Sequence, residues 1–287
     1  MKNFDEESVS IVIPAKNEVE SLKTLCPKLR SAFPNWQIVL VDDGSTDETA
    51  TIARQHNIQV VSHPYSMGNG AAIKSGVRAA ERKTVICMDA DGQHQVEDIK
   101  KLVDKMREGY DMVVGSRRKE AQANIARAFA NGFYNKFSSV ISDHDIKDLT
   151  SGFRALDREK FAEFLYLLPN GFSYPTTITM AFLRSGYSVE YVSIDVKKRI
   201  GKSHIKPLRD GFRFIMIIFK IGSLFSPLKI FVPFSLMFFF LGMGHYLVNY
   251  VTVGRFTNMS ALLFITSIVV FLIGLLSEQI TSLTYKK

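Results

Sequence analysis

The sequence predicts an α/β fold with a mostly parallel sheet and helices on both of its faces, followed by a C-terminal part that belongs to a membrane. Three observations predict it. Short β-branched runs alternate with helical patterns, carboxylate-rich turns follow two of these runs, and two long uncharged stretches lie near the end of the chain.

The elements of the soluble part follow from local periodicity. Strands are predicted at residues 9–13, 37–41, 60–61, 85–88 and 112–114, with one helix at 18–33 and another ending at residue 53. Leu22, Leu25 and Leu29 share one face of the first helix, as expected of a helix that covers a sheet. Strand, helix and strand in succession favour a parallel sheet. Residues 1–205 are therefore expected to form one soluble domain with a full core.

The C-terminal part, residues 230–287, contains two stretches without any charged residue, at about 230–250 and 256–277. Each is long enough to cross the hydrocarbon layer of a bilayer as a helix. The alternative is a pair of buried helices in a soluble protein, but the rest of the chain is too small to enclose both. We predict two transmembrane helices.

Between these parts, residues 206–229 combine apolar side chains with basic ones, Arg209, Arg213, Lys220 and Lys229. Such a composition is typical of an amphipathic helix lying at the headgroup level, and Pro227 would break it before the first span. A helix packed on the soluble domain is the competing interpretation.

The formal net charge of +8 indicates an anionic partner. No nucleic-acid-binding module is recognisable, so we expect anionic lipid and not nucleic acid. The short connection between the spans carries only Arg255, whereas Lys286 and Lys287 follow the second span and many basic residues precede the first. The chain is thus predicted to be a multi-pass protein of the inner or plasma membrane, with a cytoplasmic domain and both termini cytoplasmic. Cys26 and Cys87 lack metal-binding spacing and are expected to be reduced core thiols.

The turn after residues 85–88 is the first candidate site. Asp89 and Asp91 stand one residue apart where a parallel strand ends, and ligands of such sheets bind at that edge. Two hard oxygen donors suit Mg²⁺ or Mn²⁺, which take further oxygens from a nucleotide's phosphates. An acidic, solvated turn is the alternative for this segment. His94 is expected to be structural or to support the site, because hard cations prefer oxygen.

A second carboxylate-rich turn follows residues 37–41. Asp42 and Asp43 could accept hydrogen bonds from ribose hydroxyls or a base N–H, while Gly44 permits the turn and Ser45 or Thr46 caps the next helix. A capped turn without ligand is the alternative. A dinucleotide-binding oxidoreductase is disfavoured, since no Gly-x-Gly-x-x-Gly turn follows the first strand.

Taken as an ordered set, these segments resemble the family 2 glycosyltransferases of the GT-A fold, and among them the polyprenyl-phosphate glycosyltransferases related to dolichyl-phosphate mannose synthase. Lys16 and His204 depart from the family pattern. The motifs that carry the resemblance are PAKNE (14–18), VDDGSTD (41–47), GNGAAI (68–73), DADGQH (89–94), GSR (115–117), DLTSGFR (148–154) and RIGKS (199–203).

The resemblance implies a role for each matching residue. The nucleoside would be held by residues of the first two motifs: Pro14, Ala15, Glu18, Asp42 and Asp43.

The same resemblance implies that Asp89 and Asp91 bind the metal and the diphosphate and act with Arg117 as the catalytic residues. Gln93 would be a further metal ligand or a sugar contact. The phosphates would also be met by four residues, of which the two arginines could equally be solvated surface side chains: Arg127, Arg199, Lys202 and Ser203.

The absence of acidic residues from one segment of the sequence predicts the kind of acceptor. Residues 169–183, where glycan-extending relatives tend to carry an acidic base, contain no Asp or Glu. A sugar hydroxyl needs a general base, whereas a lipid phosphate is already anionic. We therefore expect a UDP- or GDP-linked sugar to be transferred to polyprenyl phosphate, undecaprenyl or dolichyl, with inversion at the anomeric carbon.

Two other functions remain open from the sequence. One is a transferase that extends a glycan or a glycolipid hydroxyl, and the other is a non-catalytic membrane adaptor that retains the nucleotide-binding fold. The two spans are also compatible with a homo-oligomer.

Overall fold

The protein is seen in a computed structural model, in which the structure is described for residues 9–117, 132, 135–136, 138–139, 142–171, 173–196, 216, 219–220 and 222–284. The chain divides into two compact units, residues 1–137 with 144–205, and residues 138–143 with 206–287. Most of the predicted interfacial region, residues 206–229, lies outside the described residues.

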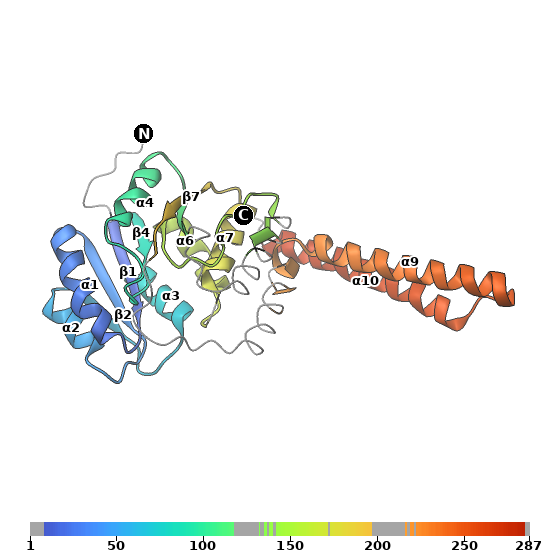
Figure 1. Ribbon diagram of the computed structural model, residues 1–287, viewed down its shortest axis with the longest axis horizontal. Coiled ribbons are helices and arrows are strands. Elements are labelled where there is room, and N and C mark those ends of the chain that lie inside the picture. The colour runs from blue at the N-terminus through green and yellow to red at the C-terminus, as the bar shows by residue number, and fades with distance from the viewer. Residues whose placement is uncertain are drawn as a thin grey trace. The chain divides into compact units, whose positions relative to one another are not determined.

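The first unit is built on a seven-stranded sheet with the order β3-β2-β1-β4-β6-β5-β7 (Figure 1). All pairings are parallel except those of β6 with β4 and β5, so the predicted mostly parallel sheet is confirmed. The sequence did not predict β6 and β7, and β6 is a four-residue strand with charged residues at both ends. The strands are β1 (Val9–Ala15), β2 (Gln37–Asp42), β3 (Gln59–Ser62), β4 (Thr84–Cys87), β5 (Met112–Arg117), β6 (Arg154–Asp157) and β7 (Val189–Ile194).

Helices cover both faces of this sheet, as predicted. Along β2 the side chains alternate: Ile38 and Leu40 join the core formed with α1 and α4, whereas Val39 and Val41 pack with Ala72 of α3. This alternation explains why buried parallel strands are apolar throughout. The helices are α1 (Val19–Ala32), α2 (Thr49–Gln55), α3 (Asn69–Ala79), α4 (Asp98–Arg107), α6 (Arg158–Glu163), the 3₁₀ turn η2 (Leu165–Leu167) and α7 (Tyr174–Arg184).

The reversed direction of β6 decides which loops meet. Strands β1, β2, β4 and β5 all end at one edge of the sheet, and β6 begins at that edge because it runs opposite to its neighbours. Residues 148–153, which lead into β6, therefore lie beside the turns that leave β4 and β5.

The two cysteines are free and buried, Cys26 in α1 and Cys87 in β4. Burial raises the pKa of the Cys26 thiol to about 11 and that of Cys87 to about 12. Both groups are therefore neutral thiols at physiological pH, and their burial confirms the predicted core positions.

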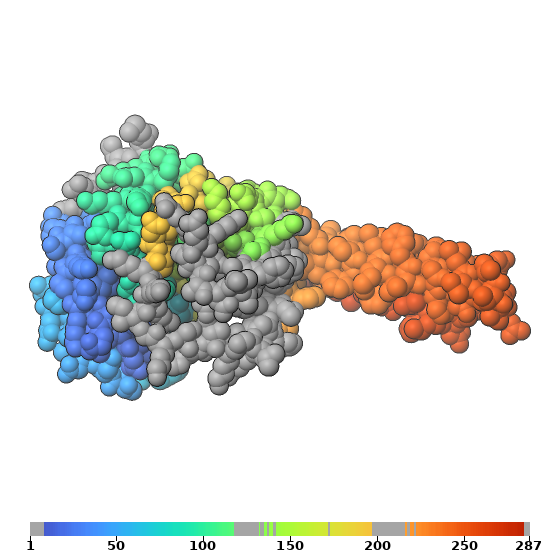
Figure 2. All heavy atoms as spheres, in the orientation of Figure 1, coloured from blue at the N-terminus to red at the C-terminus, as the bar shows by residue number. Residues whose placement is uncertain are grey.

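The second unit contains two long helices, α9 (Pro227–Val253) and α10 (Asn258–Thr284), which lie side by side as a hairpin. The space-filling view shows them in contact along their length (Figure 2). Both are long and apolar enough to cross a membrane. Their outward side chains include Phe240, Val251 and Leu276, which are 65%, 83% and 61% exposed. These two helices are thus not the buried helices of a soluble core, and an apolar surface of this extent fits a bilayer.

Polar contacts join the two helices inside the hairpin. Ser235 and Ser267 each donate a hydroxyl hydrogen bond to the other's carbonyl oxygen, with O–O distances of 2.9 Å. His245 Nδ1 lies 3.0 Å from Ser260 Oγ, so this histidine of α9 packs against α10. Such paired groups remove the penalty of unsatisfied polar atoms in hydrocarbon.

Candidate active site

The turn after β4 presents two carboxylates at the edge of the sheet. Gly92 adopts a left-handed φ of 70°, which allows the chain to reverse, and Gln93 N–H donates to Asp91 Oδ1 at 3.1 Å. The Asp89 side chain is 36% exposed, so it remains available to a ligand.

Asp89 is framed by the loop before β6. A Cβ atom on Gly152 would lie 2.7 Å from Asp89 Oδ2, so a larger residue there would force the carboxylate to move. His94 Nε2 lies 3.8 Å from the same oxygen, and the imidazole stacks on Phe153 with a centroid distance of 4.7 Å. His94 thus supports the carboxylate from a buried position, as expected.

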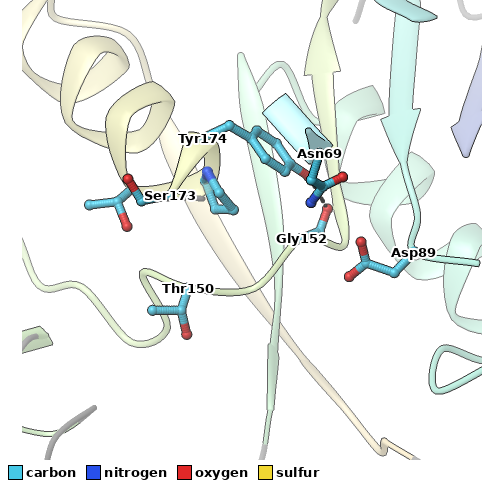
Figure 3. Close-up of a pocket in the computed structure, with 8 residues that line it drawn as sticks. Asn69, Asp89, Thr150, Gly152, Ser173 and Tyr174 are labelled. Atoms are coloured by element: carbon cyan, nitrogen blue, oxygen red, sulfur yellow. Dashed lines mark hydrogen bonds between the residues drawn. The ribbon is translucent and has the colours of Figure 1, made fainter. Parts of the chain in front are cut away.

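A pocket of about 140 Å³ opens next to Asp89 (Figure 3). One wall comes from the loop before β6 and the other from the start of α7, and the Tyr174 hydroxyl joins them by donating to the Gly152 carbonyl at 3.0 Å. Asp89 is the one carboxylate among the described residues that line the pocket, which are Asn69, Asp89, Thr150, Gly152, Ser173, Tyr174, Pro175 and Thr176.

Arg117, the last residue of β5, is held by a buried carboxylate. Its Nε and Nη2 donate to Asp148 at 2.8 and 3.0 Å, and Nη2 also donates to Thr150 Oγ1 at 2.6 Å. The Nη1 group has no hydrogen-bond partner among the described residues, so it is the part of the guanidinium that can meet a ligand. Burial by itself would lower the pKa of Arg117, but the bonds to Asp148 and the nearby charge of Asp89 outweigh it and raise the pKa.

The loops after β1 and β2 are tied to each other. Asn17, with a φ of 54°, receives a hydrogen bond on its side-chain oxygen from Thr46 N–H at 2.8 Å, and its own N–H donates to Ser45 Oγ at 3.0 Å. Glu18 N–H donates to Thr49 Oγ1 at 3.0 Å. Pro14 and Glu18 are therefore brought to the same edge as the second carboxylate-rich turn.

Asp42 and Asp43 have different surroundings. Asp42 Oδ1 accepts the Ser45 N–H at 2.9 Å, which caps the turn. Asp43 accepts four hydrogen bonds, from the His63 ring, the Ser66 hydroxyl and two backbone N–H groups, at 2.7 to 2.9 Å. Since a carboxylate has about four acceptor sites, Asp43 is fully occupied in bracing the segment that leads into α3. The structure thus places Asp43 as a buried support and leaves Asp42 as the less saturated of the two.

The start of α3 is joined to the loop that precedes α7. Gly70 N–H donates to the Gly171 carbonyl at 3.2 Å and Ala71 N–H to the Asn170 carbonyl at 2.9 Å. A side chain at Gly70 would overlap the Pro169 carbonyl oxygen, so glycine is required there. This contact sets Asn69 at the pocket.

The structure brings the predicted residues Pro14, Ala15, Glu18, Asp42, Asp43, Asp89, Asp91, Gln93 and Arg117 to one edge of the sheet. The predicted residues Arg127, Arg199, Lys202 and Ser203 lie outside the described residues. The sequence assigned no role to Asp148, Thr150 or Tyr174. The first two belong to the DLTSGFR motif and could have been found there, whereas nothing in the sequence marks Tyr174.

The metal prediction can be compared with the donor set. Within the described part of the chain, no three His, Cys, Asp or Glu side chains form a group that could hold a metal ion. The turn offers the carboxylates of Asp89 and Asp91 and the amide of Gln93. Mg²⁺ usually binds one or two protein carboxylates and keeps water or phosphate oxygens in its other coordination positions. This open turn therefore suits such a cation better than a closed cage of protein ligands would.

The buried carboxylates predict how stability depends on pH. Burial by itself would raise the pKa values of Asp43, Asp111 and Asp148, but the hydrogen bonds they accept outweigh it and lower all three. Their stabilisation is complete above the unfolded pKa of about 4 and is lost as the pH falls through the lower folded values. The melting temperature of detergent-solubilised protein should therefore fall steeply below about pH 4. A melting temperature unchanged down to about pH 2.5 would contradict this.

Comparison with known proteins agrees with this geometry. Residues 10–165, more than half of the chain, match the model described as glycosyl transferase family 2, and residues 226–283 match the GtrB C-terminal hairpin. Glycosyltransferase AglJ of Haloferax volcanii is 29% identical over 96% of this chain and 95% of its own length. Dolichol-phosphate mannosyltransferase of Pyrococcus furiosus is 29% identical over 88% of this chain and 73% of its own.

Among solved structures, glucosyl-3-phosphoglycerate synthase from Mycobacterium tuberculosis, in complex with Mn²⁺, UDP and phosphoglyceric acid, superposes with a TM-score of 0.61. The match has 20% sequence identity and covers 76% of this chain and 78% of that one, and it confirms the predicted GT-A fold. A sheet edge with an Asp-Ala-Asp turn, the matching family model and this fold lead to one conclusion: the chain belongs to glycosyl transferase family 2.

Proposed function

We propose that this protein is a membrane-bound inverting glycosyltransferase that moves a sugar from a UDP- or GDP-linked donor to polyprenyl phosphate. One observation carries the choice of acceptor. The described lining of the pocket offers hydroxyl, amide and aromatic groups but no carboxylate apart from Asp89, which is needed for the donor. A hydroxyl acceptor would lack a general base there, while a phosphate acceptor needs none.

The relatives support the same acceptor. The Pyrococcus furiosus protein is named a dolichol-phosphate mannosyltransferase. Residues 226–283 of this chain match the GtrB C-terminal hairpin, and this hairpin would place the site near lipid. The apolar hairpin would hold the catalytic domain at the membrane, where a polyprenyl phosphate presents its headgroup.

The donor site is proposed at the sheet edge. Asp42, with Pro14, Ala15 and Glu18, would hold the nucleoside, and Asp43 would brace the loop behind them. Asp89, Asp91 and Gln93 would hold Mg²⁺ or Mn²⁺, the second of which the mycobacterial neighbour contains. When bound, such a cation supplies positive charge that stabilises the departing diphosphate.

The reaction is proposed as a single displacement. An oxygen of the lipid phosphate forms a bond to the anomeric carbon while the bond from that carbon to the diphosphate breaks. The nucleoside diphosphate leaves with the electron pair, and no proton is transferred. Arg117 Nη1 would meet the diphosphate, and the fork of bonds to Asp148 keeps that guanidinium in place. Arg127, Arg199, Lys202 and Ser203 remain proposed phosphate contacts.

The test is transfer of labelled sugar. Purified protein, Mn²⁺ and a panel of radiolabelled UDP- and GDP-sugars are incubated with polyprenyl phosphate or with the corresponding alcohol, and lipids are extracted. We expect acid-labile labelled lipid with the phosphate only, and an anomeric configuration opposite to that of the donor. Label on the alcohol would favour the glycolipid-extending function, and retention of configuration would exclude the one-step route.

The proposed domains are residues 1–205 as the catalytic domain, 206–229 as the interfacial region and 230–287 as the membrane part. We further propose that the catalytic domain and both termini are cytoplasmic, since the connection between the spans carries only Arg255.

Cysteine labelling tests this orientation, because the native thiols are buried and give little background. In intact cells a membrane-impermeant maleimide should label a Val253→Cys variant at the tip of the hairpin. It should label Lys28→Cys, an exposed position of the first unit, only after permeabilisation. The opposite pattern would reverse the topology.

A further inference from the structure

Arg154 is an arginine enclosed within the first unit. It is the first residue of β6, is 0% exposed, and is paired in the sheet with Cys87 of β4 and Val114 of β5. Its neighbours Phe153 and Ala155 belong to the core formed with α1 and α4. Because side chains alternate along a strand, Arg154 projects to the opposite face, where it reaches α7.

The partners of this guanidinium are neutral. Nη1 donates to the Pro175 carbonyl and to Thr179 Oγ1, each at 3.0 Å, while Nε and Nη2 donate to the Ser151 carbonyl. The Tyr174 ring centroid lies 5.9 Å from its central carbon.

No carboxylate of the described residues lies within ion-pair distance of Arg154, and the nearby Asp148 is already paired with Arg117. Burial lowers the pKa of Arg154. The ordinary value is so high that the group stays charged at neutral pH. A buried charge without a counter-ion is costly, and an anionic ligand nearby would reduce that cost.

The partners of Arg154 belong to the two segments that form the walls of the pocket beside Asp89. Ser151 stands between Thr150 and Gly152 in one wall, while Tyr174 and Pro175 belong to the other. Figure 3 shows these walls, with the Tyr174 hydroxyl bonded to Gly152 next to Asp89. The guanidinium therefore lies one layer behind the surface that a ligand would touch.

We propose that Arg154 is a positioning residue that fastens the loop before β6 to the start of α7 and gives the pocket a fixed positive charge that favours anionic, phosphate-bearing ligands. The proposal rests on the proposed function for the identity of those ligands. A buried charge acts through a medium of low polarity, so its effect reaches a ligand one layer away and grows with the ligand's own charge. The N–H donors of the planar guanidinium fasten the loop to α7, and its positive charge favours the anionic ligand.

The experiment separates charge from packing by comparing Arg154→Met with Arg154→Lys in the full-length, detergent-solubilised protein. Dissociation constants are measured by calorimetry with Mn²⁺ present for pyrophosphate, UDP, GDP and the two uncharged nucleosides. Arg154→Met should weaken pyrophosphate and both diphosphates about tenfold and the nucleosides less than about twofold. Arg154→Lys should restore most of the affinity for the charged ligands, although its transfer rate should stay low because the fork is lost.

Arg158→Met is the matched control, since that arginine lies four residues along the chain and contacts the Ala80 carbonyl outside the pocket. It should leave all five affinities unchanged. Unaltered binding of pyrophosphate by Arg154→Met would overturn the proposal, as would equal losses for charged and uncharged ligands.

If Arg154→Met does not fold, a comparison of Arg154→Gln with Arg154→Lys gives the same information. If the wild-type protein binds pyrophosphate but neither UDP nor GDP, that result counts against the proposed function. The comparison of the Arg154 variants with pyrophosphate still tests the role of Arg154.

Discussion

Replacing Asp89 by asparagine should reduce sugar transfer by roughly a thousandfold while the protein stays folded. The carboxylate lies at the pocket and is 36% exposed, and His94 Nε2 lies 3.8 Å from its Oδ2. An amide of the same shape keeps the packing against Gly152 but removes the negative charge that a divalent cation needs. Initial rates of labelled lipid formation, measured together with the melting temperature, give the result.

Asp104→Asn is the matched control, because Asp104 is an exposed residue of α4 that pairs with Arg107. Its activity should equal that of the wild type. Asp89→Asn that retains more than about a tenth of the wild-type rate would exclude Asp89 as a metal ligand.

Replacing Arg117 by methionine should cost both activity and stability. The variant leaves the Asp148 carboxylate buried without its cation, which we expect to cost about 2–3 kcal/mol in the free energy of unfolding. This is less than for a fully buried pair, because the Arg117 side chain is 30% exposed. Transfer should fall by about a hundredfold, since the group proposed to meet the diphosphate is gone. Denaturant unfolding and initial rates measure the two effects.

Combining Arg117→Met with Asp148→Asn separates these effects. Removing the unpaired charge should recover part of the lost stability without recovering transfer. Arg107→Met, which breaks an exposed ion pair, should leave both quantities nearly unchanged. A double variant with restored transfer would show that Arg117 acts only by stabilising the fold.

The membrane part and most of the sheet could be predicted because their signals are local. Uncharged length identifies a helix that can span a bilayer, and continuous apolar runs such as β1 and β4 identify buried strands. The short strand β6 escaped prediction because its outer residues, Arg154 and Asp157, are charged. Arg154 is nevertheless buried, because it donates hydrogen bonds to carbonyl and hydroxyl oxygens of α7 and to a carbonyl oxygen of the loop before β6.

The roles of the two carboxylates after β2 could not be predicted from the residues around them. Asp42 and Asp43 are adjacent in sequence and equal in type, yet only the structure distinguishes them. His63, Ser66 and two backbone N–H groups converge on Asp43, and these come from a segment twenty or more residues away. No pattern around residue 43 could have indicated that its oxygens are already occupied.

By itself the sequence determined the α/β class, the two apolar helices and the acidic turn at the end of β4, because strand periodicity, hydrophobic length and turn chemistry depend on residues close together in the chain. Only the tertiary structure decided which side chains share the pocket. Asp89, Gly152 and Tyr174 lie far apart in sequence and meet because β6 runs against its neighbours, bringing the loop that precedes it to the edge where β4 ends. Strand direction depends on contacts across the whole sheet, and no local stretch of residues contains it.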